Sequence, residues 1–345
     1  MKTRELYIKA VGTYLPENMT DIKEARKTKP AAEFEEDLFD DGEYVSISVA
    51  GDTPAVDMAV HAARDALKVA EEPVQILFHA SMVQQGPEGW SSAGYILREL
   101  GLSNLGGFDI VQGANSVLGA LEIASGWLAV VPDARNALVT TALNAGSAEF
   151  DRWHSAGTSI VLGDGAAAIV LGKGGGIARV EAVNSLMFPE LEGIHRGTLP
   201  LFEKDLGIRR QVDLSVRFKE FALTNGFGPM DLLTQITNMN TEVVQRSLKD
   251  AQLEAGDIAR VIHQHVGPMM IDLSVMRPLG LPLSKSTWDY GQTVGHVGSC
   301  DYLLSLGYLL NTGQLSVGDH VLLTGCAPGF NVASAILTIT GDGAQ

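Results

Sequence analysis

The sequence predicts a duplicated α/β fold, and two observations carry this prediction. Strand-like runs alternate with helix-like runs along the chain, which is typical of a central sheet covered by helices. The order helix, strand, glycine-led buried helix, strand then occurs a second time in the C-terminal half. A chain of 345 residues fits two domains or one large duplicated fold. Two long units indicate packed halves rather than a solenoid, which needs at least about three repeats.

The elements of the first half follow from the spacing of apolar residues. A helix at 53–69 is predicted by apolar side chains such as Val56, Ala59 and Ala63 at helical intervals, and the stretch at 119–131 is apolar all round, which is typical of a buried helix. The charged, weakly periodic segment 17–43 is expected at the surface. The other predicted elements are strands at 5–11, 74–78 and 136–140, a helix at 91–100, and two strands within 158–172 around Gly163-Asp164-Gly165.

The second half repeats this order. A helix and strand within 231–263 correspond to those within 53–79, the apolar stretch 302–310 corresponds to the buried helix of the first half, and a strand follows at 320–324. The glycine-rich run at 172–176 breaks the pattern between the two copies. We therefore place the boundary there and expect halves at residues 1–173 and 174–345.

Composition restricts the partners and the compartment. Acidic residues outnumber basic ones by 41 to 25, and the net charge of −16 argues against a nucleic-acid partner, which would select for Lys and Arg. The two cysteines, Cys300 and Cys326, form neither a disulfide framework nor a four-cysteine zinc site and suit the reducing cytoplasm. No signal peptide is recognisable, and the apolar stretch 117–131 is shorter than the ~20 residues of a membrane span. We expect no membrane association.

The start of each predicted buried helix is a candidate for the chemistry. In this alignment of the halves Ala114 and His296 occupy equivalent positions, and we expect both to open onto one cleft between the halves. A helix N-terminus offers free N–H groups and a partial positive charge, which stabilise a thiolate or an oxyanion. A nucleophile is therefore expected at position 114, although alanine itself cannot act as one.

His296 and Asp301 form the second candidate pair. A spacing of five does not place two side chains on one face of a helix, but Gly295 and Gly298 could turn the backbone and bring them together. A carboxylate on one imidazole nitrogen would then leave the other nitrogen as a general base. The alternative is equally open from the spacing alone: an Asp that initiates the helix and a His that only fills the core entrance.

Three further features are candidates of lower specificity. His263 and His265 lie two apart on a predicted strand and would share a face, so that one could line the site while the other packs; a metal site is disfavoured because no further ligands follow. The turn ending at Gly329 could direct backbone N–H groups at a reacting carbonyl or be a simple turn. Gly163-Asp164-Gly165 lacks the pattern of a nucleotide-binding loop, and both cysteines are more typical of a core than of a nucleophile.

Together these residues resemble the ketoacyl-acyl-carrier-protein synthase III branch of the thiolase superfamily. The resemblance covers nearly the whole chain and rests on five segments: 11–17, 108–110, 163–168, His263-Gln264 and Gly329-Phe330. It implies a thiolase-like duplicated αβαβα five-layer sandwich, usually a homodimer. It also implies thioesters of coenzyme A or of an acyl-carrier protein as substrates, with no other cofactor.

Two departures indicate an acyl-transferring sub-branch of polyketide and antibiotic pathways. Relatives carry a catalytic Cys where this chain has Ala114, and condensing members carry Asn where this chain has His296. The resemblance implies a set of Cys or Ser, His and Asp that moves an acyl group to an alcohol or amine of a small acceptor, possibly a glycoside. A His oriented by Asp301 suits deprotonation of a hydroxyl, whereas an Asn amide suits enolate stabilisation.

Alternatives to acyl transfer stay open. The chain could be a decarboxylative condensing or priming synthase in which His263 assists decarboxylation, or a non-catalytic partner subunit that binds acyl chains or a carrier protein. Ala114 itself has three explanations: a deliberate Cys-to-Ala replacement, a nucleophile moved to Ser116, or a naturally inactive chain. We favour the first, because Gly113, His296 and Asp301 remain around the vacated position.

Overall fold

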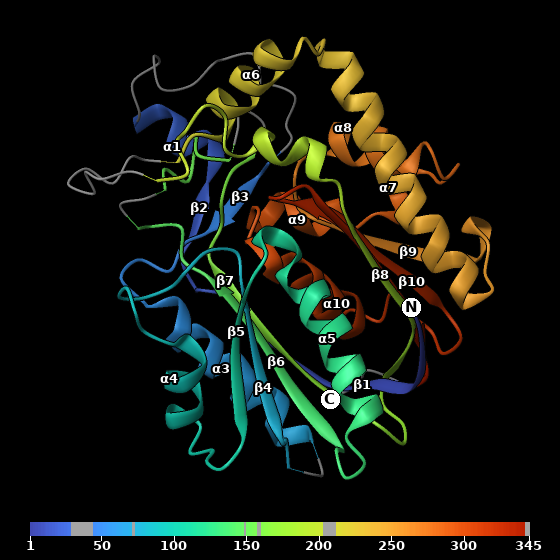
Figure 1. Cartoon of the computed structure of the whole chain (residues 1–345). Helices are drawn as coiled ribbons and strands as arrows, with labels where there is room; N and C mark the ends of the chain where they lie inside the picture. The colour runs from blue at the N-terminus through green and yellow to red at the C-terminus, as the bar shows by residue number, and fades with distance from the viewer. Residues whose placement is uncertain (29–43, 71–72, 148–149, 157–159, 203–211, 342–345) are drawn as a thin grey trace.

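The fold is a mixed α/β structure built on one large central sheet (Figure 1). The computed structural model describes residues 1–28, 44–70, 73–147, 150–156, 160–202 and 212–341. Its strands are β1 (Lys2–Tyr14), β2 (Met19–Asp21), β3 (Ser46–Ser48), β4 (Ile76–Ser81), β5 (Gly106–Val111), β6 (Asn136–Leu143), β7 (Gly165–Gly172), β8 (Ala178–Met187), β9 (Ile258–His263), β10 (His320–Ala327) and β11 (Asn331–Ile339). The longer helices are α1 (Ile22–Thr28), α3 (Ala55–Val69), α4 (Ser92–Glu99), α5 (Ser116–Val130), α6 (Leu214–Asn225), α7 (Pro229–Ala251), α9 (Trp288–Val294) and α10 (Asp301–Asn311).

The sheet is symmetric about its centre, as a duplication predicts. The nine strands run in the order β5-β4-β6-β7-β1-β8-β11-β10-β9. On one side β4 and β6 are parallel and β7 is antiparallel to both β6 and β1; on the other, β9 and β10 are parallel and β11 is antiparallel to both β10 and β8. The antiparallel pairing of β1 with β8 joins the two sides. The predicted boundary after residue 173 falls between β7 and β8.

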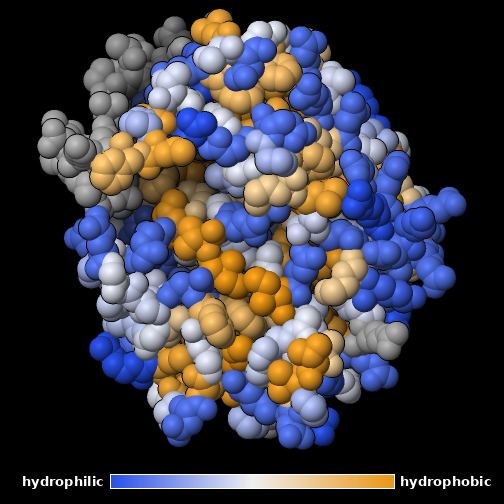
Figure 2. Space-filling view, in the orientation of Figure 1, coloured by the Kyte–Doolittle hydropathy of each residue, from blue (hydrophilic) through white to orange (hydrophobic). Residues whose placement is uncertain are grey.

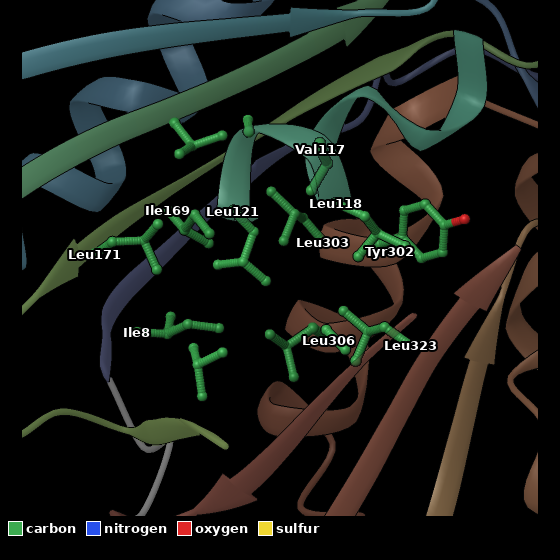
Figure 3. Packing of buried hydrophobic residues seen from close by; sticks show 14 of the residues in the cluster. Ile8, Val117, Leu118, Leu121, Ile169, Leu171, Tyr302, Leu303, Leu306 and Leu323 are labelled. Atoms are coloured by element: carbon green, nitrogen blue, oxygen red, sulfur yellow. The ribbon is translucent and has the colours of Figure 1, made fainter. Parts of the chain in front are cut away.

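Five layers result from the way the helices cover this sheet. Helix α3 packs on β1, β6 and β7 from outside, and α7 packs on β8, β10 and β11. Helices α5 and α10 lie between the two sets of strands: α5 contacts β4, β6, β8 and β11, and α10 contacts β1, β7 and β9. The largest apolar cluster lies around these two central helices (Figure 3). The predicted five-layer α/β sandwich is confirmed.

One expectation about a single element needs correction, and one is confirmed for the described residues. Within the described residues 160–172 one strand, β7, begins at Gly165, and Leu162 forms an isolated bridge with His296 in place of the expected second strand; residues 157–159 lie outside the described part. The charged segment 17–43 lies at the surface, as expected, in its described part, where it forms β2 and α1; its residues 29–43 lie outside the described part of the chain. Among the described residues no helix has both the length and the apolar character needed to cross a membrane.

Candidate active site

The turn that carries position 114 packs against the β10–β11 hairpin. Ala114 lies in the 3₁₀ turn η2 (Gly113–Asn115), directly before α5, and is 7% exposed. Gly113 has φ +57°, and a Cβ there would lie 2.4 Å from Pro328 Cδ. Glycine is therefore required, because only it adopts this conformation while the hairpin turn approaches so closely. The turn that contains Gly329 thus lies beside the nucleophile position.

The structural counterpart of Ala114 is Ser299, and the expected equivalence with His296 is wrong by three residues. A second 3₁₀ turn, η7 (Gly298–Cys300), precedes α10 and begins at a glycine with φ +61°, as η2 does before α5. The turns η2 and η7 are in contact, so the starts of the two central helices do meet. His296 belongs to the segment that leads into η7. Whether Ala114 and His296 share one open cleft stays a prediction.

His296 and Asp301 form the predicted pair. His296 Nδ1 donates to Asp301 Oδ2 at 2.5 Å, and both side chains are buried, with His296 6% and Asp301 0% exposed. Gly295 has φ +83°, so the backbone does reverse around this residue pair. Asp301 is also the first residue of α10, where the helix dipole favours a negative charge. Asp301 therefore has both roles considered from the sequence: it binds His296 and it begins the helix.

The Asp301 carboxylate is held ionised by its surroundings. Besides His296 it accepts hydrogen bonds from the amides of His265 at 2.8 Å and Val297 at 2.7 Å. Burial acts to raise the pKa of Asp301, but the adjacent imidazoles and these hydrogen bonds outweigh it and hold that pKa below its usual range. An ionised Asp301 fixes the proton of His296 on Nδ1 and leaves Nε2 as the acceptor.

The backbone of His296 is held by the motif that was rejected as a nucleotide loop. The His296 amide donates to Val161 O at 2.8 Å, and the Gly163 amide donates to His296 O at 3.0 Å. Asp164 fixes this segment, because its buried carboxylate forms an ion pair with Arg152 at 3.0 Å and accepts the amides of Ala50 and Ala145. No pattern in the sequence indicates this supporting role of Asp164.

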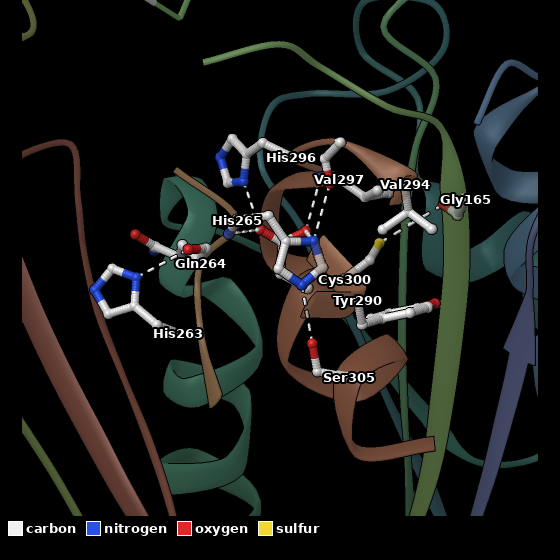
Figure 4. A network of polar contacts seen from close by, with 12 residues as sticks. Gly165, His263, Gln264, His265, Tyr290, Val294, His296, Val297, Cys300 and Ser305 are labelled. Carbon is white, nitrogen blue, oxygen red and sulfur yellow. Dashed lines mark hydrogen bonds and ion pairs between the residues drawn. The ribbon is translucent and has the colours of Figure 1, made fainter. Parts of the chain in front are cut away.

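His263 and His265 have different roles and do not share a face, since β9 ends at His263. Both ring nitrogens of His265 are bound, Nδ1 to Gly295 O and Nε2 to Ser305 Oγ, each at 2.9 Å (Figure 4). His263 Nδ1 donates to Gln264 O at 2.9 Å, and its Nε2 has no hydrogen bond within the described part of the chain. Burial lowers the pKa of His263 to about 4. His265 therefore packs, whereas His263 presents an unprotonated nitrogen.

Ser116 and Gly329, the remaining candidates, differ in whether their polar groups are already hydrogen-bonded. The Ser116 hydroxyl is fully buried, accepts the Gln112 amide at 2.7 Å, and lies 2.7 Å from Ser81 O and 2.8 Å from Gly113 O. It stabilises the start of α5 and faces no open space. Gly329, at φ +92°, donates its amide to no backbone acceptor among the described residues.

Neither cysteine has the character of a nucleophile. Burial raises the pKa of the Cys326 thiol to about 11 and raises that of Cys300 further. Metal binding also lacks a scaffold in the described residues, where no three His, Cys, Asp or Glu side chains gather in a suitable group. Among the candidate groups on the described residues, His263 Nε2, His296 Nε2 and the Gly329 amide have no hydrogen-bond partner.

Comparisons with known proteins agree with this architecture. The family model 3-oxoacyl-[acyl-carrier-protein] synthase III matches residues 108–185, and its C-terminal counterpart matches residues 248–339. The beta-ketoacyl-[acyl-carrier-protein] synthase III of Clostridium perfringens (strain SM101 / Type A) is 25% identical over 301 residues, which cover 86% of this chain and 87% of that protein.

Solved structures match over the whole chain. ChlB3, described as an acyltransferase, is 34% identical and superposes with a TM-score of 0.89 over 99% of both chains. The 3-oxoacyl-[acyl-carrier-protein] synthase III of Aquifex aeolicus VF5 superposes with a TM-score of 0.75 over 96% of this chain and 99% of that chain; at 20% identity it supports the fold alone. The chain therefore belongs to the 3-oxoacyl-[acyl-carrier-protein] synthase III family, a family of acyl-transferring enzymes with the thiolase fold.

Proposed function

We propose that this protein is an acyltransferase that moves an acyl group from an acyl-CoA or acyl-carrier-protein thioester to a hydroxyl or amine of a small acceptor, such as a glycoside. The reaction would belong to cytoplasmic secondary metabolism and require no cofactor besides the thioester. The nucleophile belongs at position 114, so the chain with Ala114 is an inactivated form. The single observation that carries the proposal is the contact of His296 Nδ1 with Asp301, which leaves Nε2 as a base.

With cysteine at position 114 the reaction has two steps. First, His296 takes the thiol proton, the sulfur forms a bond to the acyl carbon, and the carrier leaves as a thiolate that receives that proton. Second, His296 takes the proton of the acceptor hydroxyl, whose oxygen bonds to the acyl carbon while the bond to sulfur breaks. The imidazolium then returns its proton to the sulfur at position 114. The Gly329 amide would stabilise the oxyanion in each step.

The tautomers of the two histidines support transfer over condensation. With His296 Nδ1–H bound to Asp301 and His263 Nδ1–H bound to Gln264 O, the Nε2 atom of each neutral ring is a hydrogen-bond acceptor. A decarboxylative condensation needs donors for the enolate that develops on the thioester oxygen. An incoming hydroxyl or amine instead needs acceptors for its protons. The two histidines offer such acceptors.

The decisive experiment restores the nucleophile. The Ala114→Cys variant, incubated with a series of acyl-CoA thioesters, is expected to gain one acyl mass at residue 114, located by peptide mass spectrometry. Addition of hydroxyl acceptors should then discharge the adduct as an ester, without release of carbon dioxide. The unaltered chain is the matched control and should remain unmodified. Absence of an adduct with every thioester and carrier protein tested would sink the proposal.

Ala114 also favours a second candidate, a non-catalytic partner subunit. Such a chain would bind an acyl chain or carrier protein and form a stable complex with an active relative. Release of carbon dioxide from malonyl thioesters by Ala114→Cys would point to a condensing synthase. Neither adduct nor carbon dioxide, together with a stable complex with an active relative, would point to the partner role.

A homodimer through β5 is part of the same proposal. This strand forms one edge of the sheet and exposes Phe108, 55% accessible, and Val111. Ile123 and Val130 are exposed on the neighbouring α5, and hydrophobic side chains gather on the face of the molecule where these elements lie (Figure 2). Exposed apolar edges of this kind favour pairing with a second chain. We likewise propose residues 1–173 and 174–345 as duplicated halves, which the mirrored strand order supports.

A further inference from the structure

The residue after the nucleophile position has a side chain that no step of the reaction uses. Asn115 is fully buried in η2, immediately before α5, a helix whose side chains are mostly apolar. Its side chain points away from solvent, into contact with three other elements of the site. Since a buried amide costs free energy unless its hydrogen bonds are made, each of its partners is informative.

The donor end of the Asn115 amide binds the β10–β11 hairpin. Nδ2 donates to Gly325 O at 3.0 Å, to Asn331 O at 3.1 Å and to Asn331 Oδ1 at 3.0 Å. Gly325 and Asn331 lie on either side of the turn that contains Gly329. The amide therefore ties position 114 to the segment that presents the oxyanion-binding N–H.

The acceptor end binds the elements that carry the two histidines. Oδ1 accepts from Gln264 Nε2 at 3.1 Å and from Tyr302 OH at 2.7 Å. Gln264 follows His263 and accepts its Nδ1 proton at the backbone, and Tyr302 follows Asp301 in α10. Both donors and both lone pairs of the Asn115 amide are thus used.

The surrounding chain leaves room for this convergence. A Cβ at position 325 would lie 2.3 Å from Tyr302 OH and 2.6 Å from Gln264 Cδ, so any larger residue there would displace the partners of Asn115. Gln264 Nε2 also donates to Cys326 O at 2.8 Å, which fixes the orientation of its own amide. The amide groups of Asn115 and Gln264 therefore both have hydrogen-bond partners within this cluster.

We propose that Asn115 is a positioning residue that holds the nucleophile position, His263, the His296–Asp301 pair and the Gly329 turn in one register. This inference rests on the proposed function. Asn115 touches no substrate and acts through its five contacts with these three other elements. A displacement of reacting groups by about 1 Å costs on the order of 100-fold in rate. Loss of this amide should therefore slow the chemistry far more than it weakens substrate binding.

The test uses Asn115→Ala in the Ala114→Cys background. The matched control is Asn184→Ala in the same background, since the Asn184 amide also binds two side chains, Ser247 and Asp250, but does so beneath α7 on the outer face of the sheet. Tyr302→Phe is a second variant that removes one hydroxyl contact and keeps the apolar packing. Three quantities are measured: the single-turnover acylation rate, the KM for the donor, and the pH profile of alkylation by iodoacetamide.

We expect Asn115→Ala to slow acylation by about 10- to 100-fold with the donor KM within about threefold of the parent. Tyr302→Phe should slow it by about 3- to 10-fold. The alkylation midpoint should rise by half a pH unit or more, because the thiolate is no longer held at the start of α5. Asn184→Ala should lower the unfolding temperature without changing either the acylation rate or the alkylation midpoint.

The outcomes separate this inference from the proposed function. If Ala114→Cys itself accepts no acyl group, the proposed function fails, while the alkylation profile still decides the role of Asn115. If Asn115→Ala fails to fold, Tyr302→Phe decides it. The inference is overturned if the folded variants acylate within threefold of the parent, or, where no acylation exists, alkylate with an unshifted midpoint.

Discussion

Replacement of Asp301 by Asn tests the core of the mechanism with a change of one atom. The carboxylate is fully buried and accepts three hydrogen bonds, from His296 Nδ1 and from the amides of His265 and Val297. Asparagine has the same shape but offers one acceptor oxygen and one NH₂ group. It therefore cannot satisfy all three donors in either orientation.

The size of the effect follows from the two orientations. With NH₂ toward Val297, one buried N–H loses its acceptor, at a cost of about 1–3 kcal/mol in the free energy of unfolding. With NH₂ toward His296, the His265 amide loses its acceptor at a similar cost, and the imidazole is driven to the tautomer whose Nε2 is protonated. In that tautomer His296 cannot act as a base, and an equivalent change in a serine protease lowers kcat by about 10⁴-fold. In both orientations the imidazolium loses its counter-charge.

The assay separates these consequences. In the Ala114→Cys background, Asp301→Asn should transfer the acyl group to a hydroxyl acceptor at least about 100-fold more slowly, and urea unfolding should show a loss of about 1–3 kcal/mol. Asp250→Asn is the control, because Asp250 accepts Asn184 Nδ2 at 3.1 Å and pairs with the N-terminal ammonium at 3.0 Å far from the central helices. The base assignment is refuted if Asp301→Asn transfers within about threefold of the parent while showing the stability loss.

Three further predictions concern stability, the alternative nucleophile and assembly. Burial lowers the pKa of His263 and of His195 to about 4, against 6.5 in the unfolded chain, so the stability that each contributes is complete above pH 6.5 and is lost as the pH falls toward 4. Between pH 7 and 5 the free energy of unfolding measured with urea should fall by about 2 kcal/mol for each histidine. His195→Gln should abolish the part of this fall that is due to His195. A free energy of unfolding that does not depend on pH in this range would contradict the prediction. Ser116→Ala should lower the unfolding temperature yet leave acylation of Ala114→Cys within about threefold, whereas an acyl group found on Ser116 of the unaltered chain would move the nucleophile there. If the proposed homodimer forms through β5, Phe108→Lys should convert it to a monomer in sedimentation, while Val317→Lys, at a residue exposed in the loop before β10, should not.

Much of the fold follows from local periodicity. The helix predicted at 53–69 is observed as α3 (Ala55–Val69). It could be predicted because the helical spacing of its apolar residues does not depend on which other element they pack against. The residue-by-residue alignment of the second half with the first could not be obtained from periodicity. Gly295 and Gly298 both precede the central helix and both have positive φ, so the sequence offers two glycines to align with Gly113. Only the start of the 3₁₀ turn at Gly298 distinguishes them.

Contacts within the site could be predicted where the two residues lie close together in the sequence. His296 and Asp301 lie five residues apart, and the glycines beside them allowed the hydrogen bond to be predicted as one of two open alternatives. Which of His263 and His265 faces the site depends on Ser305 and Gly295, which are remote in the chain. The cluster around Asn115 joins residues more than 140 positions apart, and its only local sign is one amide at the start of an apolar helix.

Of His296 and Asp301, only His296 indicates that catalytic chemistry is retained around Ala114. Asp301 would be kept by the fold alone, because it begins α10 and accepts the amides of His265 and Val297. His296 has no such role, since its ring binds only Asp301 and its Nε2 has no partner within the described residues. The presence of a histidine there is therefore the argument that position 114 belongs to a nucleophile, and alanine differs from the expected cysteine by one sulfur atom.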